Sequence, residues 1–254
     1  MGAKTPGCLF AAAMSNSRLK LLLLHALPLD GSMWKGQMHL LPGSTHAPTL
    51  YSLGDSIDAW AVEALRSVRG TRLIVVGCSV GGSCALEIAA LAPERIAALV
   101  LIGTKARHRP DPTLHVSVLE LLQAKGLAAA WDTYWASLFS ESASSQVIDA
   151  AKAIAFRQPL QDVARGVTVF HTRPSREHVV LSLPRPIVIV TGEDDRAPGP
   201  EASSMQTAQA RHGRLTIVRN CGHYVPLEQP EYLNAVLQEL ISEQQRSSPE
   251  QHLR

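Results

Sequence analysis

The chain has 254 residues, with 24 Lys or Arg, 22 Asp or Glu and a formal net charge of +2. So small an excess of positive charge, with no run of Lys or Arg, argues against a nucleic-acid-binding protein. The leucine-rich run at 19–24 is far too short to span a membrane, so no membrane span is predicted.

The composition is that of an ordinary globular protein, 46% hydrophobic and 18% charged. The length suffices for one α/β domain that carries a small inserted subdomain. The four cysteines show neither a C-x-x-C pair nor the spacing of metal ligands: Cys8, Cys78, Cys84 and Cys221. They therefore indicate reduced thiols and a cytoplasmic protein, and no spacing points to a metal or cofactor.

The first part of the chain contains one clear strand and one clear helix. Residues 1–17 are expected to be a disordered extension. Leu19–Leu24 is a continuous apolar run that ends in a turn-rich segment, as expected for a buried parallel strand. We expect a short helix over Trp34–Leu41, a brief strand over Pro48–Ser52, and an amphipathic helix over Ile57–Val68.

The next segment, Arg72–Gly82, carries the strongest motif of the sequence. Leu73–Val76 is a short β-branched strand, and it runs into Gly77-Cys78-Ser79-Val80-Gly81, a G-x-S-x-G pattern. A strand that turns sharply into a helix places the serine in a strained conformation at the tip. The glycines let neighbouring backbone pass without a Cβ clash. The pattern predicts that Ser79 is an exposed nucleophile in front of a helix N-terminus.

The remaining elements alternate until a helical insertion interrupts them. A helix over 82–91 and a strand over Ile96–Ile102 follow the motif. Four amphipathic segments then succeed one another without a strand: Thr113–Lys125, Leu127–Phe139, Ser145–Phe156 and Gln161–His171. The last elements are two strands and a helix: Ile187–Thr191, Leu215–Val218 and Pro230–Ile241. This order predicts a mostly parallel sheet of about six strands with a helical lid.

The predicted domain limits follow from this order. The α/β core takes residues 18–104 and 184–243. The lid takes 105–183, inserted after the strand that ends near Ile102, and 244–254 forms a flexible tail.

The ends of two late strands supply the partners that a serine nucleophile needs. A weakly nucleophilic hydroxyl requires a base, and the base requires an orienting group. An acidic cluster, Glu193-Asp194-Asp195, follows the strand at 187–191, and His223 follows the strand at 215–218. Because parallel strands present their carboxyl ends on one edge, Ser79, an acid and His223 are expected to meet there.

Four motifs make the sequence resemble the α/β-hydrolase superfamily, in particular its small lidded esterases and enol-lactonase-like members. They are the segments 21–34, 77–82, 191–198 and 222–230. The resemblance covers about Leu19 to Ile241. It implies Asp195 as the triad acid, with Asp194 and Glu193 as alternatives, and the amides of Val80 and Leu27 as an oxyanion hole. One departure is His25-Ala26, where the family usually has His-Gly.

The resemblance implies a serine hydrolase that cleaves a carboxylic ester of a small or medium acyl substrate through an acyl-enzyme. The same triad also serves enol-lactone, thioester or C–C bond hydrolases, and a non-catalytic receptor or scaffold is the alternative of another class. A small-molecule ester or lactone is the expected ligand, and the protein is expected to be a monomer or homodimer. The residues expected to line the substrate pocket are His25, Trp131 and Trp135. Because His25 stands at the end of a strand, it is expected to organise the loop rather than to act as a base.

Overall fold

A computed structural model describes residues 19–70 and 72–247; the extension expected at 1–17 lies outside the described residues. Within this part of the chain, six strands form one sheet, in which every pair of neighbours is parallel. The order across the sheet is β2-β1-β3-β4-β5-β6. The strands are β1 (Leu19–Leu24), β2 (Thr45–His46), β3 (Arg72–Cys78), β4 (Ile96–Ile102), β5 (Ile187–Gly192) and β6 (Gly213–Val218).

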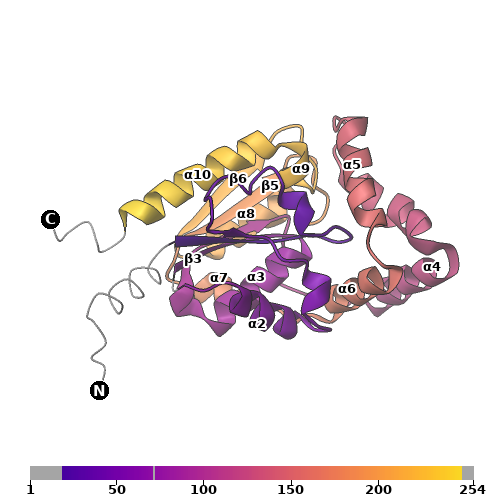
Figure 1. The fold of residues 1–254 in the computed structure, drawn as a ribbon, viewed down its shortest axis with the longest axis horizontal. Coiled ribbons are helices and arrows are strands. Elements are labelled where there is room, and N and C mark those ends of the chain that lie inside the picture. Colours follow the sequence, from indigo (N-terminus) through magenta and orange to yellow (C-terminus); the bar gives the residue numbers. More distant parts are fainter. Residues whose placement is uncertain (1–18, 71, 248–254) are drawn as a thin grey trace, which may run out of the picture.

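The central strands are buried on both faces, which explains why they are apolar runs rather than alternating patterns. Helices α2 (Ile57–Ser67) and α3 (Val80–Leu91) lie below the sheet in Figure 1, and α10 (Pro230–Arg246) lies above it. Helix α8 (Gly199–Gln209) contacts β5 and β6. The predicted fold class is therefore confirmed, with a sheet that is all parallel rather than mostly parallel.

The insertion after β4 is helical, as the sequence predicts. Helices α4 (Pro112–Ala130), α5 (Ser145–Phe156) and α6 (Leu160–Thr172) stand apart from the sheet at the right of Figure 1. Gly126 interrupts α4 with a φ of 77°. A π-helical turn at Trp131–Trp135 and a 3₁₀ turn at Ala136–Leu138 follow. Helix α7 (Glu177–Ser182) returns the chain to the core, where it contacts α3 and α8.

Two local predictions near the N-terminal end of the described chain are wrong. The short helix expected over Trp34–Leu41 is absent. A 3₁₀ helix lies at Gly31–Trp34 instead, because the Asp30 carboxylate accepts the Ser32 N–H (2.7 Å) and starts the helix earlier. The strand expected over Pro48–Ser52 is also absent. A 3₁₀ helix occupies Leu50–Leu53, and β2 pairs earlier in the chain.

The C-terminal prediction needs a smaller correction. Helix α10 continues to Arg246, so the first residues of the tail expected at 244–254 are helical. Gln244 is buried and its carbonyl accepts a hydrogen bond from Arg72 (2.6 Å), which holds this last turn against β3. No helix of the described segments is both long and apolar enough to cross a membrane.

Candidate active site

Ser79 lies at the turn between β3 and α3, in a backbone conformation that L-residues rarely adopt (φ 55°, ψ −117°). Its N–H donates to the Ile102 carbonyl at the end of β4 (2.9 Å), which holds the strained turn in place. A Cβ at Gly77 would collide with the Gly81 carbonyl, and one at Gly81 with the carbonyls of Leu24 and His25. Only glycine fits at either position, so the motif forms the sharp elbow that its spacing predicts.

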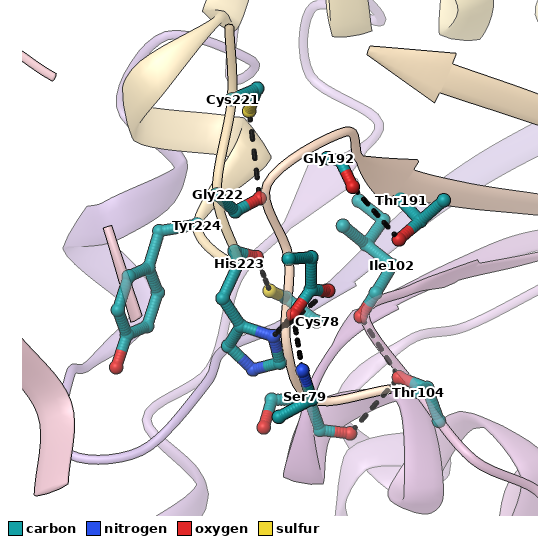
Figure 2. Close-up of polar contacts among 12 residues, drawn as sticks. Cys78, Ser79, Ile102, Thr104, Thr191, Gly192, Cys221, Gly222, His223 and Tyr224 are labelled. Carbon is teal, nitrogen blue, oxygen red and sulfur yellow. Dashed lines mark hydrogen bonds and ion pairs between the residues drawn. The ribbon is translucent and has the colours of Figure 1, made fainter. Parts of the chain in front are cut away.

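The loops after β5 and β6 bring an acid and an imidazole together. Nδ1 of His223 lies 3.1 Å and 3.2 Å from the two carboxylate oxygens of Asp195, and both side chains are buried. Oδ1 of Asp195 also accepts the Ala197 N–H (2.8 Å), which fixes the carboxylate. The hydrogen bond to Asp195 assigns the proton to Nδ1 and leaves Nε2 of His223 unprotonated and able to accept a proton. Figure 2 shows Ser79 and His223 at the same edge of the sheet.

The other two acids of the cluster are used elsewhere. Asp194 accepts the hydroxyl of Ser140 (2.5 Å), and Glu193 accepts the Asn220 N–H (3.3 Å). Of the three alternatives, therefore, Asp195 is the one that contacts His223. The Ser79 hydroxyl makes no hydrogen bond to any described residue.

The two amides expected to bind an oxyanion carry no competing acceptor within residues 19–70 and 72–247. They are the N–H of Val80, at the first position of α3, and the N–H of Leu27, in the loop after β1. The phenol of Tyr224 donates to the Leu27 carbonyl (3.0 Å), which ties this loop to the residue next to His223. Ala26, where the family usually has glycine, is fully buried, and its N–H contacts the Met33 sulfur (3.3 Å).

A cavity of about 710 Å³ lies over these groups. Leu27, Ser79 and His223 line its floor. Its apolar walls come mainly from the lid and from α8: Leu114, Val118, Tyr134, Trp135, Leu138, Val167, Phe170, Ala202 and Met205. Ser79, His223 and Leu27 thus line one mostly apolar cavity, and Asp195 contacts the histidine from behind, which is an arrangement suited to acyl transfer.

Comparison with known proteins agrees with this fold. Residues 21–236 match the model of the alpha/beta hydrolase family. The chain belongs to this family. Solved structures that resemble this hydrolase include a thermophilic esterase from Thermogutta terrifontis, with a TM-score of 0.79 and 24% identity over 90% of this chain and 91% of the other. The enol-lactonase from Burkholderia xenovorans LB400 aligns with a TM-score of 0.76 and 17% identity over 89% and 92%.

A curated relative matches a shorter stretch of the hydrolase. It is pimeloyl-[acyl-carrier protein] methyl ester esterase from Aromatoleum aromaticum, 32% identical over 96 residues. That stretch is 35% of this chain and 38% of the relative, so the chain aligns with well under half of the relative's length.

Two residues expected in the substrate pocket of this hydrolase do not line the cavity. His25 is fully buried; its Nε2 accepts the Leu50 N–H (2.8 Å) and its Nδ1 donates to the Ala26 carbonyl (3.1 Å). Burial lowers the pKa of His25 to about 4, so the ring is neutral and organises the loop after β1. Trp131 is buried against Phe139 and Phe156 in the lid core, whereas Trp135 does line the cavity.

Sequence reasoning assigned no role to Glu228, although the residue belongs to one of the quoted motifs. Its carboxylate accepts three backbone N–H groups, those of Gly222 (2.9 Å), Tyr224 (3.1 Å) and Ser140 (2.9 Å). The first two flank His223, whose own N–H donates to the Leu138 carbonyl (2.8 Å). Burial raises the pKa of Glu228 even though these three bonds act in the opposite direction. Glu228 therefore fixes the histidine loop of the hydrolase and attaches it to the base of the lid.

Proposed function

We propose that this hydrolase cleaves a carboxylic ester of a small or medium acyl substrate through an acyl-enzyme on Ser79. One observation carries the proposal: a strained serine at the elbow and a histidine paired with a buried aspartate line the same cavity. Burial of the pair in a largely apolar site strengthens its electrostatic effect.

The proposed reaction has two steps that use the same groups. Nε2 of His223 takes the Ser79 proton while the serine oxygen attacks the acyl carbonyl, and the amides of Leu27 and Val80 stabilise the oxyanion. His223 then protonates the leaving alcohol, and the acyl-enzyme forms. Water, activated by His223, attacks the acyl-enzyme and releases the acid. Asp195 holds the imidazole tautomer and stabilises its cation in both steps.

The same groups would serve an enol-lactone, a thioester or a C–C bond next to a ketone, and these are the alternatives within the class. The name of one structural relative, the enol-lactonase, favours the lactone. The names of the thermophilic esterase and of the methyl ester esterase favour an ester. A non-catalytic receptor or scaffold is the alternative outside the class. We further propose a small-molecule substrate and a cytoplasmic location.

The test compares wild type with Ser79→Ala on p-nitrophenyl esters of increasing chain length, together with labelling by a fluorophosphonate. We expect turnover and labelling in wild type and the loss of both in Ser79→Ala. Ser83→Ala removes a nearby hydroxyl of the same cavity and is expected to keep the label. A folded wild type that hydrolyses none of these esters would contradict the proposed ester substrate. Failure on enol-lactones and thioesters as well would contradict these alternatives within the class.

A further inference from the structure

Arg173, at the carboxyl end of α6, is a buried cation that lacks an acidic partner. The residue is only 8% exposed and lines the cavity that contains Ser79. Its guanidinium lies 3.8 Å from the centre of the Phe170 ring, and Nη1 donates to the Phe170 carbonyl. No Asp or Glu of residues 19–70 and 72–247 forms an ion pair with it. Burial lowers its pKa to about 10, which still leaves the group charged at neutral pH.

A neighbouring arginine, Arg176, forms a structural ion pair with a buried carboxylate. Arg176, three residues further on, places Nε and Nη2 at 2.7 Å and 2.8 Å from the two oxygens of the buried Glu87. That bidentate pair joins the end of the lid to α3. The Nε and Nη2 donors of Arg173 have no such carboxylate partner among the described residues. Burying a charge without a counter-charge costs folding free energy, so this arrangement calls for an explanation.

The rest of the cavity wall does not supply the missing negative charge. Its formally charged residues are four cations and two acids: Lys105, Arg107, Arg109 and Arg173, with Asp111 and Glu177. Glu177 pairs with Arg107 at 3.7 Å, and Asp111 accepts the Leu114 N–H (2.9 Å) at the start of α4. The cavity therefore has an excess of positive charge, and Arg173 is its most buried member.

The histidines beside Arg173 respond to that charge. His171 and His108 line the same cavity, and the ring of His171 stacks on that of His115 with centroids 5.0 Å apart. Burial lowers the pKa of His171 to about 4, and electrostatic interaction with His115, Arg173 and His108 lowers it further. His171 is therefore neutral at neutral pH, and the fixed charge at this end of the cavity is the guanidinium.

We propose that Arg173 binds a carboxylate carried by the substrate, so that the hydrolase acts on esters that bear a second, free carboxylate. This inference rests on the proposed function, because it takes Ser79 as the group that attacks the ester. The Nε and Nη2 donors of a guanidinium match the two oxygens of a carboxylate. A carboxylate also supplies the single negative charge that the cavity wall lacks at this point. The apolar walls then hold the carbon chain between the carboxylate and the ester.

The experiment uses two p-nitrophenyl esters of equal chain length, the neutral hexanoate and the mono-ester of adipate, which ends in a carboxylate. The measured quantity is the ratio of their kcat/KM values. We expect wild type to favour the adipate ester, and Arg173→Gln to lower the ratio by about 10- to 100-fold, as for the loss of charge-assisted hydrogen bonds. Arg173→Lys is expected to retain part of the preference.

The matched control is Arg109→Gln, which removes the same charge from an exposed position on the same cavity. It is expected to keep the ratio within about twofold of wild type, because an exposed charge is screened. Equal effects of the two variants would overturn the assignment to Arg173, since they would indicate a general field.

Inhibition of wild type provides a measurement that does not depend on folding of a variant. Adipate, which carries a second carboxylate, is expected to compete with the neutral ester more strongly than hexanoate does. Equal inhibition by adipate and hexanoate would overturn the assignment of a carboxylate site. Ser79-dependent hydrolysis without any preference for the adipate ester would overturn the inference alone, whereas the absence of hydrolysis of both esters would overturn the proposed function.

Discussion

Acidification is expected to destabilise the loop after β1 through His25. The ring is fully buried, and Nε2 accepts the Leu50 N–H, so protonation of Nε2 would place two donors against each other. Burial lowers the pKa from 6.5 to about 4. The unfolded chain therefore takes up a proton at a higher pH than the folded chain does. The contribution of His25 to the free energy of unfolding is therefore fully present above pH 6.5 and is lost as the pH falls from 6.5 toward 4. This loss amounts to about 2 kcal/mol between pH 7.5 and pH 5.

The assay is urea unfolding at pH 7.5, 6 and 5 for wild type, His25→Gln and the control His39→Gln. Gln at position 25 offers an oxygen to the Leu50 N–H and does not titrate, whereas His39 is exposed. We expect His25→Gln to lose about 2 kcal/mol less than wild type between pH 7.5 and pH 5, and His39→Gln to follow wild type. If wild type and His25→Gln lose the same free energy over this range, the reasoning is refuted.

Two further predictions concern the histidine loop and the lid. Glu228→Gln replaces a carboxylate that accepts three N–H groups by an amide, so we expect about 2–4 kcal/mol of destabilisation and a fall in kcat. The control Glu231→Gln changes an exposed residue and should alter neither quantity. Unchanged unfolding and kcat in Glu228→Gln would contradict the role of Glu228. Trp131→Ala should lower the free energy of unfolding by about 3–5 kcal/mol without moving the chain-length optimum for p-nitrophenyl esters. Trp135→Ala should move that optimum to longer chains, because Trp135 lines the cavity. A shifted optimum in Trp131→Ala would contradict the assignment of that side chain to the lid core.

The sequence predicted the parallel sheet and the elbow because both depend on local patterns. Continuous apolar runs specify strands covered on two faces, and the spacing of Gly77, Ser79 and Gly81 specifies the turn. Topology then brings the residues after β5 and β6 to the same edge. Within the acidic cluster the residues alone left three acids open, since a shift of one residue in a loop changes which carboxylate reaches His223.

The aromatic residues of the lid show a limit of reasoning from spacing. Trp131 and Trp135 are four residues apart and would share one face of an α-helix. The segment that joins them is a π-helical turn, and residues four apart lie close to one face in this geometry as well. Trp131 nevertheless packs in the lid core against Phe139 and Phe156, while Trp135 lines the cavity. The difference depends on which parts of the lid fold back over each side chain, and the spacing of the two tryptophans does not encode it.

The sequence alone could not predict which residues pair with the buried charges, and the reason is a different one. Arg173 and Arg176 stand in similar local sequence, yet only Arg176 meets a carboxylate, that of Glu87 in α3. The difference depends on how the end of the lid returns to the core. Likewise, the three N–H groups that Glu228 accepts come from two separate segments, one of them at the base of the lid. Such contacts depend on the folded arrangement and leave no periodic signal.

Two parts of the cavity wall differ in how they are connected to His223. At the base of the lid, the Leu138 carbonyl and the Ser140 N–H are bonded to the loop that carries His223, directly or through Glu228. Leu138 also lines the cavity, so this wall and His223 form one hydrogen-bonded unit. Arg173 makes no hydrogen bond to that unit, because its described contacts are with Phe170 of α6. Changes at Arg173 should therefore alter which substrate is accepted, whereas changes near Leu138 disturb substrate fit and proton transfer together.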